Sequence, residues 1–275
     1  MADAVHRVEA TGESALRLAT LLYHDVVPPG EPDSTGFPGG AAGVYKLEWP
    51  DFESHLERLQ RVGSGVPAPP EAIVDATATG WALTFDDGGR SAAEIGERLA
   101  RRGMQATFLI TVDRIGTPGF VGRDDIRDLR ASGHSVGSHS CSHPERMSRC
   151  TWEELEYEWG RSVEVLSEIL DERVVMASVP AGYYSRTVAR AAANVGLRAL
   201  FTSEPVMRTQ RVDGCLVLGR FTILRQTPAD VAAALAWGNR VERAKQLTNW
   251  NAKKVLKTLG GPAYVAARRK ILAGR

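Results

Sequence analysis

Cysteine is scarce in this sequence, which has three in 275 residues. Cys141, Cys150 and Cys215 are odd in number and form no C-x-x-C pair, which argues against a disulfide framework. We therefore expect a reducing, cytoplasmic environment. Cys141 stands two positions after His139, and on a helical turn it would point away from that histidine, so we interpret it as a spacer.

Long apolar runs are also missing. No stretch reaches the roughly 18 uninterrupted apolar residues of a membrane span. The first ten residues lack a basic segment followed by an apolar one, which predicts no secretory signal. Both features favour a cytoplasmic protein.

Aromatic side chains are rare in the basic C-terminal part of the chain, where residues 240–275 contain ten Lys or Arg, one acid and only two aromatics, Trp250 and Tyr264. This scarcity argues against nucleic-acid binding. The formal net charge is +1, so the rest of the chain is acidic. Two interpretations of the basic segment stay open. In the first, it is a solvated helix that packs on the acidic body. In the second, it attracts an anionic ligand, either lipid head groups at the inner face of the membrane or a phosphate-bearing substrate.

Two polar motifs are present. Thr84-Phe-Asp-Asp-Gly88 ends an apolar run, which predicts a buried strand closed by the carboxylates Asp86 and Asp87. Some fifty residues later, His139 and His143 are spaced to share one face of a helical turn. Alone, each motif is more typical of a turn or of ordinary histidines. Together, one carboxylate and two histidines predict a divalent metal site with open positions, and the second carboxylate is a candidate general base.

Strand and helix patterns alternate along the chain. This alternation predicts parallel βαβ units, and their number favours a barrel over an open sheet. The expected strands are 16–23, 81–85, 105–111, 134–138, 173–179, 197–202 and 216–224, and the expected helices are 51–62, 90–102, 123–132, 151–170, 185–195 and 228–238. Chemistry in barrels gathers at the C-terminal strand ends. The polar residues and prolines expected there are His24, Asp86, Asp87, His139, Pro180 and Glu204.

The motifs Thr84-Phe-Asp-Asp-Gly88 and His139-Ser-x-Ser-His143-Pro144 resemble the first two motifs of the polysaccharide deacetylases, carbohydrate esterase family 4, the NodB-homology domain. The resemblance extends from about residue 16 to residue 235. It implies an α/β fold, a distorted (β/α)7-type barrel. The expected units are a catalytic barrel over 1–239 and a basic helical extension over 240–275.

The same resemblance implies the roles of the motif residues. Asp87, His139 and His143 would bind a divalent metal, with zinc as the expected ion. Asp86 would be the base that takes a proton from a metal-bound water. The family removes acetyl groups from N-acetylated sugars.

The third motif departs from the family's Arg-Pro-Pro-Tyr-Gly and reads Ser178-Val-Pro-Ala-Gly182. The kept proline and glycine predict a conserved turn, with the N–H of Tyr183 as oxyanion donor. The arginine that would hold Asp86 is missing, and Arg186 or Arg220 is its expected substitute. The residues expected to contact substrate are Pro180, Gly182, Tyr183, Glu204 and Arg220.

The fifth motif, Leu-x-His, also departs, because the strand ending at Arg225 has no histidine. A guanidinium does not release its proton near neutral pH, so Arg225 cannot be the acid. We predict His24 as the catalytic acid, with Asp25 or a loop group holding its tautomer. The alternative is that His24 only caps the strand or contacts substrate.

These features predict a cytoplasmic, metal-dependent N-deacetylase of polysaccharide or glycoconjugate biosynthesis. Its expected substrate is a sugar nucleotide, a lipid-linked sugar or a small glycoside. Deformylation of an amino sugar and hydrolysis of a cyclic amide are alternatives of the same fold. A non-catalytic sugar-binding relic is a further alternative, since the arginine and histidine are missing. The pair Asp86 and Asp87 argues against it, because binding alone needs no base.

Overall fold

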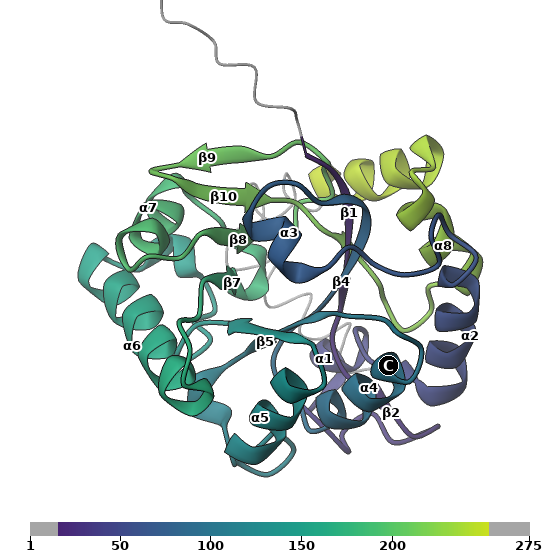
Figure 1. Cartoon of the computed structure of the whole chain (residues 1–275), viewed down its shortest axis with the longest axis horizontal. Coiled ribbons are helices and arrows are strands. Elements are labelled where there is room, and N and C mark those ends of the chain that lie inside the picture. The colour runs from purple at the N-terminus through teal and green to yellow at the C-terminus, as the bar shows by residue number, and fades with distance from the viewer. Residues whose placement is uncertain (1–15, 253–275) are drawn as a thin grey trace, which may run out of the picture.

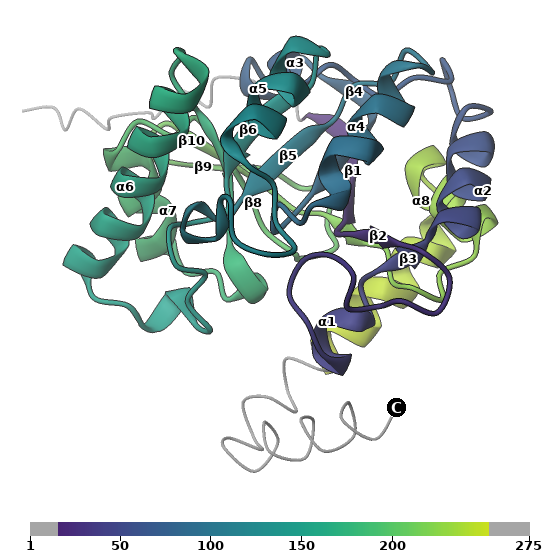
Figure 2. The same ribbon diagram turned by 90° about the horizontal axis from the view of Figure 1, so that it is seen from below.

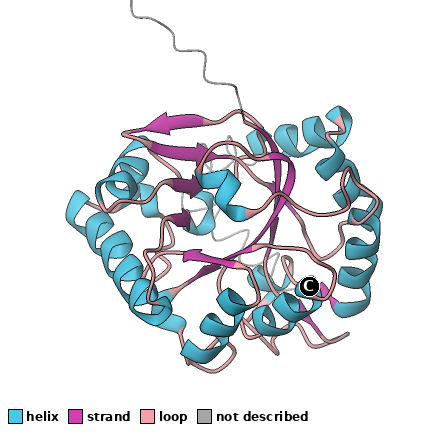
Figure 3. Cartoon of the chain, viewed as in Figure 1, coloured by secondary structure: helices cyan, strands magenta, loops and turns pink. Residues whose placement is uncertain are grey.

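The computed structural model describes residues 16–252. Strands occupy the centre and helices surround them (Figures 1 and 3). The strands are β1 Arg17–Tyr23, β2 Val26–Val27, β3 Leu47–Glu48, β4 Thr79–Phe85, β5 Thr107–Ile110, β6 Ser135–Ser138, β7 Met176–Ser178, β8 Ala199–Phe201, β9 Gln210–Val212, β10 Cys215–Leu218 and β11 Phe221–Thr222. The helices are α1 Gly40–Gly43, α2 Trp49–Leu59, α3 Pro70–Val74, α4 Ser91–Ala100, α5 Arg123–Ala131, α6 Trp152–Leu170, α7 Arg186–Asn194 and α8 Ala229–Trp237. The short 3-10 turns are η1 Val112–Arg114, η2 Met147–Arg149 and η3 Pro180–Gly182.

The main sheet has nine strands in the order β11-β1-β4-β5-β6-β7-β8-β10-β9, and only the β9–β10 pair is antiparallel. β10 pairs with β8 and β11 pairs with β1, yet only Gly219 and Arg220 separate the two strands. The interrupted strand β10–β11 therefore pairs with β8 at one end of the parallel series and with β1 at the other. This closure confirms the distorted seven-membered barrel expected from the sequence.

The prediction of a single strand over 216–224 is wrong, because the strand is interrupted at Gly219 and Arg220. A Cβ at Gly219 would lie 2.4 Å from the carbonyl oxygens of both Glu204 and Val206, so only glycine fits there. The hairpin strand β9 was not expected, and neither was α3 within the Gly/Pro-rich stretch before β4. The other expected strands and helices are present with boundaries that shift by a few residues.

α6 shows how local sequence sets an element. The Thr151 side chain accepts the N–H of Glu154, and the Glu154 carboxylate accepts the N–H of Thr151, so the helix begins with a capping box. Leu155, Trp159 and Leu166 recur at helical spacing and are buried. They pack the helix against the sheet.

The last described helical segment, residues 240–252, packs on the barrel. Gln246 Nε2 donates to Thr222 O at 2.9 Å, and the Arg243 guanidinium lies 5.1 Å from the Phe221 ring centroid. In Figure 2 this segment, in yellow, extends to the same side of the sheet as β2, β3 and α1. The remainder of the expected basic extension lies outside the described residues. Within 16–252, no helix has the length and apolar character needed to cross a membrane.

Candidate metal centre and active site

The expected ligand residues converge at the C-terminal ends of β4 and β6, which β5 separates. His139 Nε2 lies 3.3 Å from Asp87 Oδ1, and His143 Nε2 lies 3.6 Å from the same oxygen. One ligand atom from each of the three residues lies within 4.8 Å of the others. Ligands placed about 2.1 Å from a tetrahedral zinc ion stand about 3.4 Å apart, so this spacing fits a divalent cation.

The buried Ser178 hydroxyl decides which nitrogen of His139 faces the ligand group. Its Oγ lies 2.6 Å from His139 Nδ1 and donates to Asp86 Oδ1 at 3.1 Å. Because the single hydroxyl proton goes to Asp86, the serine oxygen accepts the Nδ1–H of His139. The lone pair of Nε2 then faces Asp87, as metal binding requires.

The helical turn expected over residues 139–143 is wrong, since these residues form an irregular loop. Ser140 and His143 have left-handed φ values of 67° and 62°, and Asp87 has 77°. Non-glycine residues adopt this region at a cost and often at functional sites. The strained loop brings both rings toward Asp87 although they do not share a helical face.

Glu158 of α6 fixes this loop from outside the ligand group. Its carboxylate accepts the N–H groups of Cys141 and Ser142 at 2.9 Å each, and the Ser142 hydroxyl at 2.5 Å. Cys141 turns away from the ligands, with its Sγ 3.2 Å from Asp113 Oδ1. Its place outside the ligand group agrees with its interpretation as a spacer.

Asp86 forms a buried ion pair with Arg220. The Nη1 and Nη2 atoms of Arg220 donate to the two carboxylate oxygens at 2.7 Å each, and its Nε donates to Thr202 O at 3.0 Å. Burial is the largest single influence and would raise the pKa of Asp86. The charge and hydrogen bonds of Arg220, together with the nearby His139 and His24, outweigh it, so the pKa lies below its ordinary value. Arg186, the other expected substitute, is exposed at the start of α7. Arg220 has no exposed surface, which disfavours the expected substrate contact.

His24 lies close enough to the ligand group to interact with its charges. Burial lowers the pKa of His24, while the carboxylate of Asp87 acts in the opposite direction. Its ring lies 4.7 Å from that of Tyr45, and its buried Nδ1 has no hydrogen-bond partner among the described residues. A buried polar atom without a partner is costly, so Nδ1 is available to a substrate or water.

Asp25 does not hold the tautomer of His24, contrary to expectation. Its carboxylate instead accepts the hydroxyls of Thr35 at 3.1 Å and Ser91 at 2.8 Å. Burial raises the pKa of Asp25 to about 6. The residue therefore anchors the loop after β2 to the start of α4.

The turn after β7 contains three of the expected substrate residues. Pro180 is buried, and Gly182 and Tyr183 are half-buried. The Tyr183 N–H donates to Pro180 O at 3.4 Å, which is long for a hydrogen bond. Glu204 lies near β8, where its carbonyl accepts the Arg220 N–H at 2.9 Å.

A buried lysine organises the opposite wall and was not foreseen. Lys46 Nζ donates to the carbonyl oxygens of Pro32, Thr35 and Phe37 at 2.6–2.8 Å. The Phe37 ring is thereby held 4.9 Å from the His143 ring. Sequence alone does not distinguish a buried lysine from an exposed one, so Lys46 carried no signal of this role.

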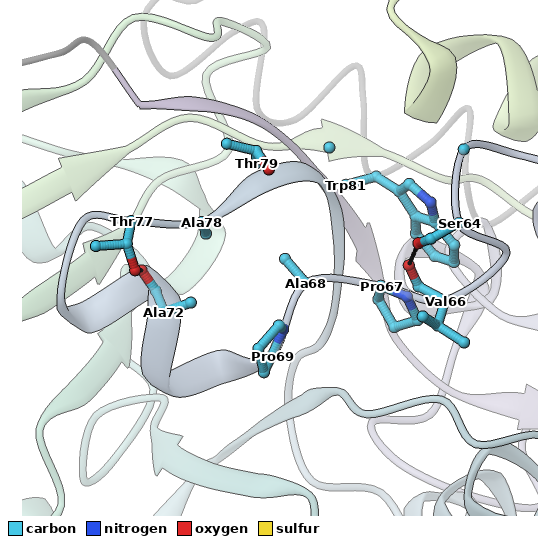
Figure 4. A pocket seen from close by; sticks show the side chains of 12 residues that line it. Ser64, Val66, Pro67, Ala68, Pro69, Ala72, Thr77, Ala78, Thr79 and Trp81 are labelled. Carbon is cyan, nitrogen blue, oxygen red and sulfur yellow. Dashed lines mark hydrogen bonds between the residues drawn. The ribbon is translucent and has the colours of Figure 1, made fainter.

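A pocket of about 330 Å³ lies at the other end of β4 (Figure 4). Its lining includes Pro67, Ala72, Thr79 and Trp81 and contains no ionisable side chain. It has no group for acid–base or metal chemistry, so the candidate site is the cluster at the C-terminal strand ends.

Comparisons with known proteins agree with this placement. The sequence model of the family described as polysaccharide deacetylase matches residues 74–200, which include all three ligand residues. This segment of the chain, a little under half of its length, is similar to the polysaccharide deacetylase family. A peptidoglycan-N-acetylglucosamine deacetylase, PgdA of Listeria monocytogenes, is 38% identical over 112 residues. That match covers 39% of this chain and 22% of PgdA, so the chain spans about a fifth of this relative's length.

Solved deacetylase structures share the fold. Streptococcus pyogenes PplD has a TM-score of 0.66 at 18% identity, covering 79% of this chain and 96% of PplD. IcaB from Ammonifex degensii has a TM-score of 0.65 at 20% identity, covering 81% and 97%. The polysaccharide deacetylase BC0361 of Bacillus cereus has a TM-score of 0.65 at 19% identity, covering 81% and 69%. These likenesses confirm the expected barrel.

Proposed function

We propose that the protein is a metal-dependent hydrolase that removes the acetyl group from an N-acetylated amino sugar. The observation that carries this proposal is an ionised carboxylate, Asp86, held by Arg220 beside a group able to bind a divalent cation. The similarity of residues 74–200 to the polysaccharide deacetylase family and the shared fold support the same reaction class.

The residues divide the work of amide hydrolysis. A divalent cation held by Asp87, His139 and His143, with zinc as the expected ion, would polarise the acetyl carbonyl and lower the pKa of a water molecule to about 7. Asp86 accepts the proton of the attacking water, and Arg220 keeps Asp86 ionised.

Two further groups of the chain complete the proposed reaction. The N–H of Tyr183, which follows the turn after β7, is the proposed donor to the developing oxyanion. His24 protonates the leaving amine. Burial lowers the pKa of His24, which makes its protonated form a stronger acid and leaves less of it at neutral pH. Pro180, Gly182 and Glu204 stay proposed substrate contacts.

The proposed substrates are a sugar nucleotide, a lipid-linked sugar or a small glycoside, met in the cytoplasm or at the inner face of the membrane. The chemistry extends to an N-formyl sugar or a cyclic amide, since both present the same carbonyl. A sugar-binding relic is disfavoured, because the Asp86–Arg220 pair preserves an ionised base that binding alone does not need.

Acetate release tests the proposal, measured over N-acetyl sugar nucleotides, lipid-linked sugars and oligosaccharides together with metal content. Asp86→Asn should keep about one divalent ion per chain and lose about two to four orders of magnitude in rate. Asp87→Asn, the matched variant one residue away, should lose both the ion and turnover. A fully active Asp86→Asn, or equal metal in Asp87→Asn and the parent, would refute these roles.

A further inference from the structure

Three side chains from separate elements lie around the Gly182–Tyr183 turn, which carries the proposed oxyanion donor. Tyr183 follows η3, Arg146 precedes η2, and Trp250 comes from the C-terminal helical segment. The Arg146 guanidinium lies 5.4 Å from the Tyr183 ring centroid. Trp250 Cη2 lies 3.1 Å from the position that a Cβ of Gly182 would take. All three side chains are half-buried.

Among the residues that the structure describes, Arg146 has no carboxylate partner, in contrast to several arginines of α5 and α6. Arg123, Arg127 and Arg161, on α5 and α6, each pair with a carboxylate at 2.6–2.7 Å. Within residues 16–252, no carboxylate lies within ion-pair distance of Arg146. A half-buried guanidinium keeps its charge, so it is poised for an anion that comes from outside the fold.

The geometry also places this arginine near the reacting centre. Arg146 is three residues beyond His143, and Tyr183 directly follows η3, the turn that comes after the end of β7 at Ser178. The Gly182 backbone has a φ of +69°, and the absence of a side chain lets the Trp250 ring approach it. Trp250 and Arg146 therefore both lie against the Gly182–Tyr183 turn, whose N–H is the proposed oxyanion donor.

We propose that Arg146, Tyr183 and Trp250 form a subsite for an anionic N-acetylated sugar, with a phosphate as the anion. Arg146 donates to the phosphate oxygens, since a guanidinium matches phosphate bidentately. Trp250 covers the apolar face of the ring that carries the phosphate. The inference rests on the proposed function and narrows its substrates to sugar phosphates, sugar nucleotides and lipid-linked sugars.

Binding to a non-hydrolysing protein tests the subsite without turnover. Zinc-loaded Asp86→Asn protein is titrated calorimetrically with N-acetylglucosamine 1-phosphate and, separately, with the neutral methyl glycoside of N-acetylglucosamine. The phosphorylated sugar should bind about tenfold to a hundredfold more tightly than the methyl glycoside, because hydrogen bonds between charged groups are stronger than neutral ones. UDP-N-acetylglucosamine, as a third ligand, separates a preference for a monoester from one for a diphosphate.

Matched variants identify the residues responsible. In the Asp86→Asn background, Arg146→Ala should remove the preference for phosphate, whereas Arg149→Ala, an exposed arginine of the same turn, should retain it. Trp250→Ala should weaken both ligands, whereas Trp237→Ala, whose side chain is 69% exposed on α8, should weaken neither.

Each result bears on the subsite separately from catalysis. Equal affinity for the two sugars, an unchanged preference in Arg146→Ala, or no binding of either sugar overturns the subsite. Acetate release at the same kcat/KM from neutral and phosphorylated sugars also overturns it, while the proposed hydrolysis stands. Conversely, Arg146-dependent binding without any acetate release keeps the subsite and refutes the hydrolysis.

Discussion

The two halves of the barrel mouth support the same candidate site in different ways. Along β4 and β6, Asp86, Asp87, His139 and His143 stand where the motif pattern places them. Along β7 and the β10–β11 segment the pattern fails, because serine replaces the family's arginine and no histidine follows. Yet a guanidinium still holds Asp86, and it comes from Arg220.

The difference teaches that a ligand and a supporting charge are constrained differently. A metal ligand must contribute its own atom at a fixed position, so its strand and spacing cannot change freely. A counter-ion for Asp86 needs only to reach the carboxylate inside the barrel, and strands on either side converge there. Once Arg220 supplies the charge, the end of β7 can carry Ser178, which joins Asp86 to His139.

The sharpest test of this comparison is Arg220→Met, which removes the relocated charge. We expect a rate loss of about a hundredfold or more, since the base is no longer positioned. An unpaired buried carboxylate costs about 3–5 kcal/mol of stability. Metal content should stay unchanged, because Arg220 contacts none of the three ligand side chains. Acetate release, thermal unfolding and metal analysis measure these effects.

Arg220→Lys and a pH profile separate positioning from stability. Asp86 must be ionised to act as a base, so the rate falls as the pH drops through its pKa. Arg220 lowers that pKa, so Arg220→Lys, with poorer geometry, should move the acid limb to higher pH. Arg225→Ala, which loses an ion pair with Glu48, is the control and should leave the limb in place. An unmoved limb in Arg220→Lys would contradict the role.

The sequence carries the first half of the site almost completely. An apolar run closed by two aspartates predicts a strand end, and parallel βαβ units bring His139 to the same edge. The spacing of His139 and His143 misled, because four residues separate the ends of a strained loop as readily as those of a helical turn. Glu158 holds that loop through its carboxylate. In sequence it is an ordinary glutamate within a helix, so nothing marks it as a buried loop anchor.

In the second half, formed by β7 and the β10–β11 segment, the sequence left two candidates for the arginine that pairs with Asp86. Arg186 and Arg220 were equal candidates until the break between β10 and β11 turned Arg220 inward. Gly219 was the available signal, since an isolated glycine in a strand pattern indicates a bend or a close approach. Ser178 stands where the family has an arginine, and its own role was not evident from the sequence. Its partners, His139 and Asp86, lie about forty and ninety residues away along the chain.

A second test concerns the missing histidine. His24→Ala should lower the rate by about a hundredfold and leave metal content intact, because His24 is proposed as the acid and not as a ligand. An acid must be protonated, so the rate falls as pH rises through its pKa, and His24→Ala should lose this alkaline limb. Burial lowers the pKa of His24, so the limb should begin below the ordinary value of 6.5.

Asp25→Asn is the comparison variant for His24. Asp25 is adjacent in sequence but contacts Thr35 and Ser91, so its replacement should leave the alkaline limb in place. An unchanged rate and pH profile in His24→Ala would assign the leaving-group proton to water or to the substrate.

The smallest expected effect belongs to Ser178→Ala, which tests whether the serine connects the two halves. Without its hydroxyl, the Nδ1–H of buried His139 loses its acceptor, and the tautomer with Nε2 free is no longer favoured. Loss of such an outer partner typically costs about tenfold to a hundredfold in metal affinity. Zinc competition with a chromophoric chelator measures this affinity without reference to activity.

Ser178→Cys, with a weaker donor and acceptor of similar shape, should have a zinc affinity between those of the parent and the alanine variant. Ser162→Ala is the matched control, since Ser162 is equally buried and bonds Ser138 at 2.6 Å but touches no ligand side chain. If Ser178→Ala and Ser162→Ala bind zinc equally well, the serine only fills space, and the two halves of the mouth are joined through Asp86 and Arg220 alone.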